Sequence, residues 1–177
     1  MRGYESAKAG GILWFGVDDA VSTVYMPIYS TITEVPECLK EGNGDLYTYS
    51  PTSAWWTYNI VANWAYTKYS AMMPDIKKVQ AAWEDKFNAQ VEVVDKAVAE
   101  LSEQQAKEWL TKYSCSQAER SHQAWKELGI YLFVKYLDGQ ERKEQDGQFL
   151  RNPYGEPEGP NRKPYPTEFL RTIHEHI

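Results

Sequence analysis

The side chains best suited to nucleophilic chemistry in this 177-residue chain are Cys38, Cys115 and His122. A cysteine attacks a carbonyl as its thiolate, which a histidine within hydrogen-bond reach can generate. Cys115 and His122 are seven residues apart, which on one helix is ~10 Å and too far for such a hydrogen bond. We therefore favour a small buried residue at Cys115 and a histidine satisfied in the core. Cys38 is interpreted as a free thiol in a loop.

A second group of possible ligands, His174-Glu175-His176, lies at the end of the chain. Residues two apart on a helix point to different faces, so these histidines cannot both bind one ion there. The expected structure is a solvated terminus, and metal binding by this tail is the alternative. The sequence contains no nucleophile elbow, phosphate-binding glycine loop or paired CxxC motif. It therefore predicts no metal and no cofactor.

The polar candidates for a substrate cleft are two carboxylates and two amides. Asp18 and Asp19 follow an apolar run, where carboxylates often reach a cleft, although adjacent carboxylates more often simply favour a turn. Asn59 and Asn63 are four residues apart and share a helix face. Buried amides need hydrogen-bond partners, so they either tie the helix to a loop, which we favour, or line a polar pocket. With Trp14, these four residues are the candidate cleft residues.

Two apolar segments near the N-terminus predict β-strands at about 11–17 and 22–29. The first is apolar throughout, which is typical of a strand buried on both faces. The second is rich in β-branched and aromatic residues, and Pro27 places its end at an edge or a bulge. A strand buried on both faces needs layers above and below it, and this chain supplies few strands. The pattern therefore hints at missing structure.

The stretch 50–69 carries three tryptophans and one charge, Lys68. Ser50 and Pro51 are a typical helix start, and Met73-Pro74 predicts the break. Apolar side chains point in every direction from such a helix, so it has to be buried on all sides. A chain of this length can hardly surround it, which again suggests a missing partner.

The rest of the chain predicts an α+β, helix-rich architecture, with Asp75 capping a surface helix and Ser102 and Gln105 forming a capping box. We treat 1–177 as a single piece in which 140–166 is irregular and rich in proline and glycine. The expected helices are 51–72, 75–100, 102–113, 116–137 and 167–175.

Charge and hydropathy exclude two classes of partner. The chain has 19 basic and 25 acidic residues and a net charge of −6, which argues against binding nucleic acid. No segment approaches the ~18 apolar residues of a membrane span. Met1 is not followed by the apolar core of a signal peptide, and the sequence leaves the compartment undetermined.

Three blocks resemble the later part of PepD-like cysteine dipeptidases: GILWFGVDD at 11–19, YMPIYSTITEVP at 25–36 and SPTSAWWTYNIVANWAYTKY at 50–69. The resemblance is less distinctive from Asp75 onward. These enzymes are N-terminal-nucleophile hydrolases, related to penicillin V acylase and bile-salt hydrolases. The resemblance implies strands of an αββα sandwich with helices packed beside them.

In that family the nucleophile is a cysteine at the mature N-terminus, whose own amino group serves as the base. Met1, Arg2 and Gly3 depart from this pattern. We therefore expect no catalytic residue in this chain and place the nucleophile upstream. The expected partners are the N-terminal catalytic part of the same enzyme and a small peptide substrate.

Two functional hypotheses follow. In the first, the chain is the C-terminal region of a dipeptidase, inactive alone, which self-associates through exposed apolar surface. In the second, it is a stand-alone module that stacks a sugar or peptide on exposed aromatic rings. The first predicts that Trp55, Trp56 and Trp64 are largely covered, or covered only by a partner. The second predicts a row of solvent-facing rings.

Overall fold

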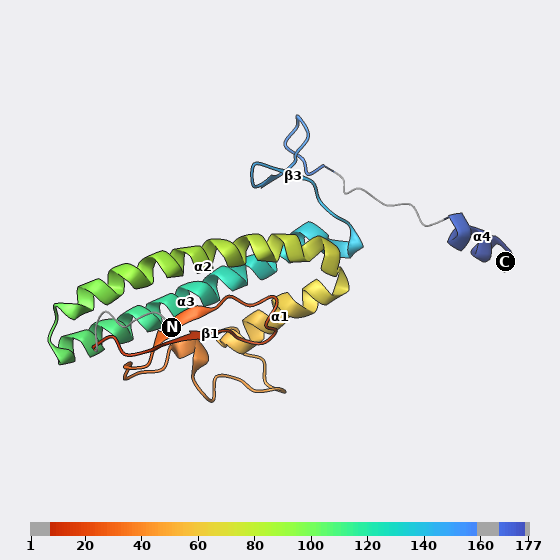
Figure 1. Cartoon of the computed structure of the whole chain (residues 1–177). Helices are drawn as coiled ribbons and strands as arrows, with labels where there is room; N and C mark the ends of the chain where they lie inside the picture. Colours follow the sequence, from red (N-terminus) through yellow and green to blue (C-terminus); the bar gives the residue numbers. More distant parts are fainter. Residues whose placement is uncertain (1–7, 159–166, 176–177) are drawn as a thin grey trace. The chain divides into compact units, whose positions relative to one another are not determined.

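The computed structural model describes residues 8–158 and 167–175, and the chain divides into two compact units, Met1–Ile130 and Tyr131–Ile177 (Figure 1). The described part is helix-rich, with a few short antiparallel strands, as the sequence predicts. The first unit contains β1 (Ile12–Phe15), β2 (Met26–Tyr29), the 3-10 helix η1 (Glu37–Leu39), α1 (Ala54–Thr67), α2 (Tyr69–Ala99) and most of α3 (Glu103–Tyr136). The second contains η2 (Leu137–Gly139), β3 (Glu144–Gln145), β4 (Gln148–Phe149) and α4 (Thr167–Glu175).

Strands β1 and β2 form an antiparallel pair in which Ile12 lies opposite Tyr29 and Phe15 opposite Met26. The expectation that β1 is buried on both faces is wrong for this chain. Leu13 is 60% exposed and Trp14 36%. Among the described residues β1 pairs with β2 alone, so its other edge has no strand beside it.

The outer side of β2 is closed by side chains of the long helices. The backbone N–H of Tyr29 donates to Ser114 Oγ at 3.2 Å, and that of Tyr25 to Glu84 Oε1 at 3.2 Å. Pro27 has no N–H to satisfy and is buried in the middle of β2. The hairpin therefore has one edge tied to the helices and one edge without a strand.

Helix α1 begins three residues later than the sequence predicts. The Ser50 hydroxyl donates to Asn43 Oδ1 at 2.6 Å, and the Thr52 N–H donates to the same hydroxyl at 3.4 Å. Ser50 therefore holds a turn, and Ser53 precedes the first helical residue, Ala54.

The break after α1 lies at Lys68 and not at Met73-Pro74. Lys68 has φ −153° and ψ 56°, and α2 begins at the next residue and continues through Pro74. Pro74 is the sixth residue of α2, where its missing N–H costs one intrahelical hydrogen bond without ending the helix. Asp75 consequently lies inside α2 and is not its cap.

In the described part of the chain only one face of α1 is buried, so the expected burial on all sides is not found. Trp55, Trp56 and Trp64 are half-buried, and Tyr66 is 61% exposed. The loop before α1 contributes to the partial cover, since Trp56 Nε1 donates to the Thr48 carbonyl at 3.0 Å. The buried face is made of small or slender residues and one tyrosine: Ala54, Thr57, Tyr58, Val61, Ala62 and Ala65.

Helix α3 is continuous where the sequence predicts two helices. Serines often end helices by bonding to the nearby backbone. Here Ser114 is fully buried, and its hydroxyl accepts a hydrogen bond from the Tyr29 N–H. The helix therefore continues through the break expected between residues 113 and 116. The predicted capping box is confirmed. Ser102 N–H donates to Gln105 Oε1 at 3.1 Å, and Gln105 N–H donates back to Ser102 Oγ at 3.3 Å.

The core of the first unit joins the two long helices to the hairpin. Tyr29 packs with Val94 and Val98 of α2 and with Leu110 of α3. Further along α3, Trp125 is fully buried, and its ring stacks on Tyr58 with centroids 5.1 Å apart. Its Nε1 donates to the Ser22 carbonyl at 3.2 Å. These contacts hold α1, α3 and the hairpin turn together.

In the second unit, Asp138 and Gly139 end the helical region with φ of 60° and 69°, as the sequence predicts. A hairpin of β3 and β4 follows, and Phe149 stacks on Tyr131 with centroids 5.8 Å apart. None of the helices in the described part has the length and hydropathy that a bilayer span requires.

Candidate functional site

Three polar residues of the first unit are joined by hydrogen bonds beside the hairpin turn. Asp18, just after β1, has a left-handed backbone with φ 63°, and its carboxylate accepts from Asn59 Nδ2 at 3.3 and 3.4 Å. Asn63 Nδ2 donates to the Asn59 side-chain oxygen at 3.0 Å and to its backbone carbonyl at 2.8 Å. The structure thus joins Asp18, Asn59 and Asn63 in one hydrogen-bonded chain, as expected for an amide that ties α1 to a loop.

Asp19 serves the turn, which is the interpretation the sequence favours. Its carboxylate accepts from the Ser22 N–H at 3.1 Å and from the Ser22 hydroxyl at 2.8 Å. Its charge also reaches α1, where it is the main cause of a raised pKa of the exposed Tyr66 phenol, with smaller contributions from burial and Asp18. Trp14 lies on β1 opposite Pro27 and takes no part in these hydrogen bonds.

Tyr66 is the member of this cluster that sequence reasoning missed. Asn59, Asn63 and Tyr66 are spaced four and three residues apart, so they share one face of α1. That spacing is the signal that could have identified Tyr66. The resulting surface, which we call the Asp18 surface, consists of Asp18, Asp19, Asn59, Asn63 and Tyr66. It offers two carboxylates, two amides and a phenol as hydrogen-bonding groups.

Neither cysteine is set up as a nucleophile. Burial, reinforced by the charge of Glu119, raises the pKa of the Cys38 thiol to about 12. Burial also raises the pKa of Cys115, with smaller contributions from Glu34 and Glu119. Both thiols are therefore protonated near neutral pH, and the thiolate is the form that attacks. Neither forms a disulfide.

His122 is a core histidine, as the sequence predicts, but its cysteine neighbour is Cys38 and not Cys115. Its Nε2 lies 2.8 Å from Thr57 Oγ1, and its Nδ1 lies 3.9 Å from Glu119 Oε2. Burial is the main cause that lowers its pKa, with a contribution from Lys126, so the neutral ring is favoured. Cys38, Glu119 and His122 also bring three potential metal ligands within 4.8 Å of one another. His174 lies on exposed α4, and His176 lies outside the described residues.

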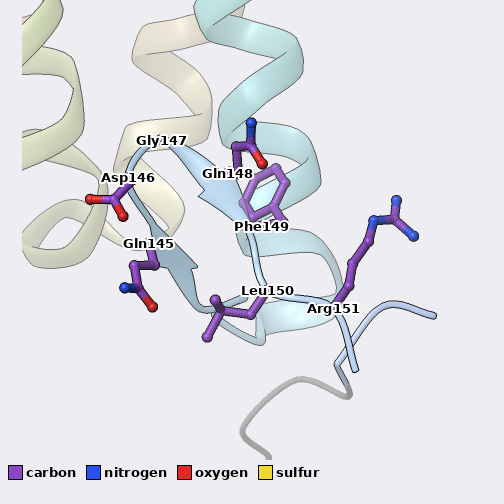
Figure 2. Close-up of a pocket in the computed structure, with 7 residues that line it drawn as sticks. All are labelled: Gln145, Asp146, Gly147, Gln148, Phe149, Leu150 and Arg151. Carbon is purple, nitrogen blue, oxygen red and sulfur yellow. The ribbon is translucent and has the colours of Figure 1, made fainter. Parts of the chain in front are cut away.

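A shallow cavity of about 730 Å³ lies in the second unit, on the β3–β4 hairpin (Figure 2). Seven consecutive residues line it, from Gln145 to Arg151. They include Asp146 and Arg151 but no cysteine, histidine, serine or threonine. The cavity contains none of the residues predicted from the sequence, and Asp146 is the one carboxylate in its lining that could act as a general base.

Comparison with known proteins finds a similarity to a peptidase family. The model of peptidase family C69 matches residues 1–82, a little less than half of the 177-residue chain. Residues 1–82 are therefore similar to peptidase family C69. That family belongs to the cysteine peptidases of the N-terminal-nucleophile type, so the resemblance found in the sequence is confirmed. No curated protein and no solved structure matches the chain.

The C69 match covers the hairpin, η1, α1 and the first part of α2. All five residues of the Asp18 surface lie within it. Cys38 and Thr57 also lie within it, whereas Glu119 and His122 come from α3, beyond the matched residues. The part of the chain related to C69 peptidases is therefore the part that carries the candidate substrate-binding surface.

Proposed function

We propose that this chain is the non-nucleophilic, C-terminal region of a cysteine dipeptidase that hydrolyses dipeptides with an N-terminal cysteine lying outside residues 1–177. The relationship of residues 1–82 to peptidase family C69 is the observation that carries the proposal. The thiols support it, because Cys38 and Cys115 are both internal and both have raised pKa values.

In this proposal the Asp18 surface binds the polar groups of the substrate. A dipeptide carries an ammonium group, an amide and a carboxylate. Asp18 and Asp19 suit the ammonium group, while the amide groups of Asn59 and Asn63 suit the other two. Asp18 is exposed and Asn59 half-buried, so the hydrogen bonds that now join them are accessible for exchange with a ligand.

The outer side of β1 supports a role in completing a larger sheet. Leu13, Trp14 and Phe15 are exposed in succession, and β1 pairs only with β2 among the described residues. An edge strand with apolar side chains is a template for pairing with another strand. We propose that strands of the catalytic part pair with β1 and form the αββα sandwich of the family.

The DNA upstream of Met1 tests this proposal. An upstream open reading frame that encodes a cysteine able to become the mature N-terminus supports it. Co-production of that segment with this chain is then expected to yield dipeptide hydrolysis. A stop codon followed directly by a promoter contradicts it. Asp18→Asn is then expected to raise KM for dipeptides in the assembled enzyme. Asp45→Asn is the matched control, because Asp45 is an exposed loop carboxylate outside the Asp18 surface.

The alternative function is a stand-alone module that stacks ligands on aromatic rings. Exposed rings on the first unit favour it: Tyr66 is 61% exposed and Tyr69 48%. The half-burial of Trp55, Trp56 and Trp64 gives no open row of rings on α1. Iodide quenching of tryptophan fluorescence separates the two functions. Strong quenching in a monodisperse monomer favours the module.

A further inference from the structure

The strongest group of chemically active side chains outside the Asp18 surface is Cys38, Glu119 and His122. Cys38 comes from η1, and the other two lie one helical turn apart on the same face of α3. Cys38 and His122 are each 4% exposed, and the ligand atoms of all three lie within 4.8 Å of one another. We propose that these three side chains bind a transition-metal dication of the Zn²⁺ type.

The separation of the ligand atoms fits such an ion after a small adjustment. Zinc bonds of about 2.0–2.3 Å in tetrahedral geometry place two ligand atoms roughly 3.3–3.6 Å apart. The ligand atoms of Cys38, Glu119 and His122 lie within 4.8 Å of one another, so each side chain has to move only part of the difference between 4.8 Å and this spacing. Glu119 can make the largest movement, because its side chain is 44% exposed.

Hydrogen bonds from neighbouring groups fix the orientation of these three side chains, as they commonly do for the ligands of a bound metal. Thr57 Oγ1 holds His122 Nε2 at 2.8 Å, which leaves Nδ1 facing Glu119 Oε2 at 3.9 Å. The backbone N–H of Cys38 donates to Glu119 Oε1 at 2.9 Å and fixes one carboxylate oxygen. A metal-bound histidine generally has its second nitrogen fixed in this way.

The donor set favours zinc-like ions over calcium or magnesium. A sulfur, a nitrogen and an oxygen suit Zn²⁺ or Co²⁺, while calcium and magnesium prefer oxygen alone. Three protein ligands leave a fourth position for water, reached past the exposed Glu119 side chain. On binding, the Cys38 S–H bond breaks, a sulfur–metal bond forms, and the proton passes to solvent. The ion would tie η1 to α3, independently of the proposed dipeptidase function.

Cobalt titration of the full chain tests the site, because a cysteine thiolate gives Co²⁺ a charge-transfer band that histidines and carboxylates do not. We expect this band at one equivalent, with cobalt displaced by Zn²⁺. Cys38→Ser is expected to abolish the band, and His122→Gln and Glu119→Gln to weaken binding at least 10-fold. Thr57→Val is expected to weaken it by roughly 10-fold through the histidine.

Cys115→Ser is the matched control and is expected to retain the band. Cobalt binding without a thiolate band, as His174 and His176 at the chain end would give, contradicts the proposal. A band that survives Cys38→Ser also contradicts it. If Cys38→Ser does not fold, the Cys115→Ser background still decides the question. There, one equivalent of Zn²⁺ must slow modification of Cys38 by a thiol reagent, and unchanged modification refutes the site.

Discussion

The two strands of the N-terminal hairpin have similar apolar sequences but opposite environments. In β2, Met26 and Tyr29 are fully buried, and N–H groups in and just before the strand donate to side chains of α2 and α3. In β1, Leu13, Trp14 and Phe15 remain at least 36% exposed. Residues 8–158 and 167–175 thus complete the packing around β2 but not around β1. The difference indicates that the helical core is self-sufficient, whereas β1 presents surface suited to a partner.

The largest expected effect is a difference in stability loss between a substitution in the helical core and one on β1. Trp125→Ala removes a fully buried ring that stacks on Tyr58 and donates to the Ser22 carbonyl. We expect it to lower the free energy of unfolding by about 3–5 kcal/mol. Trp14→Ala, on exposed β1, is expected to cost less than about 1 kcal/mol. Urea denaturation measures both, and equal losses would contradict the comparison.

The second effect concerns self-association through β1. A lysine on an edge strand blocks strand pairing, so Leu13→Lys is expected to raise the dissociation constant for self-association at least ~10-fold. Val93→Lys is the control, because Val93 is 68% exposed but lies on α2. Sedimentation equilibrium measures both. A wild-type chain that stays monomeric at high concentration would show that β1 needs no partner.

A smaller effect tests whether the capping box at the start of α3 stabilises the chain. Ser102→Ala removes the hydroxyl that accepts from the Gln105 N–H at 3.3 Å. We expect a loss of about 1 kcal/mol in the free energy of unfolding. Ser116→Ala, inside α3, is expected to change it by less than about 0.5 kcal/mol. A Ser102→Ala chain as stable as wild type would show that the capping box contributes nothing.

A separate effect is confined to alkaline pH. Burial, with a hydrogen bond to Asp95 Oδ1 at 2.6 Å, raises the pKa of Tyr29, and burial raises that of Tyr113 to about 12. Because the folded pKa values exceed the unfolded value of about 10, the stability they contribute is complete below pH 10 and is lost as pH rises. Urea titrations at pH 9, 10 and 11 measure this loss. Tyr29→Phe is expected to reduce it, and an unchanged slope would refute the assignment.

The sequence predicted the elements whose signals are local. The apolar runs located the β1 and β2 segments, Ser102 with Gln105 located a helix start, and Asp138-Gly139 located a helix end. The errors came where a distant contact changed a local preference. Ser114 serves the β2 backbone and does not end a helix.

The candidate sites also divide into those with a local sequence signal and those formed by distant contacts. The shared helix face of Asn59 and Asn63 was visible in the spacing, and so was the position of Asp18 after a strand. The approach of Cys38 to Glu119 and His122 was not visible, because it joins residues more than 80 positions apart. Spacing led only to Cys115 and His122, which lie on one helix. Only the packing of η1 against α3 brings the other cysteine to the histidine.

The central claim, that this chain carries substrate-binding surface of a dipeptidase but not its nucleophile, is tested most directly by dipeptide hydrolysis. The purified chain is expected to release no amino acids from a panel of dipeptides. The same chain joined to the segment encoded upstream is expected to hydrolyse them, and replacing the terminal cysteine of that segment by serine should abolish the activity. Hydrolysis by residues 1–177 alone, lost in Cys38→Ser or Cys115→Ser, would contradict the account.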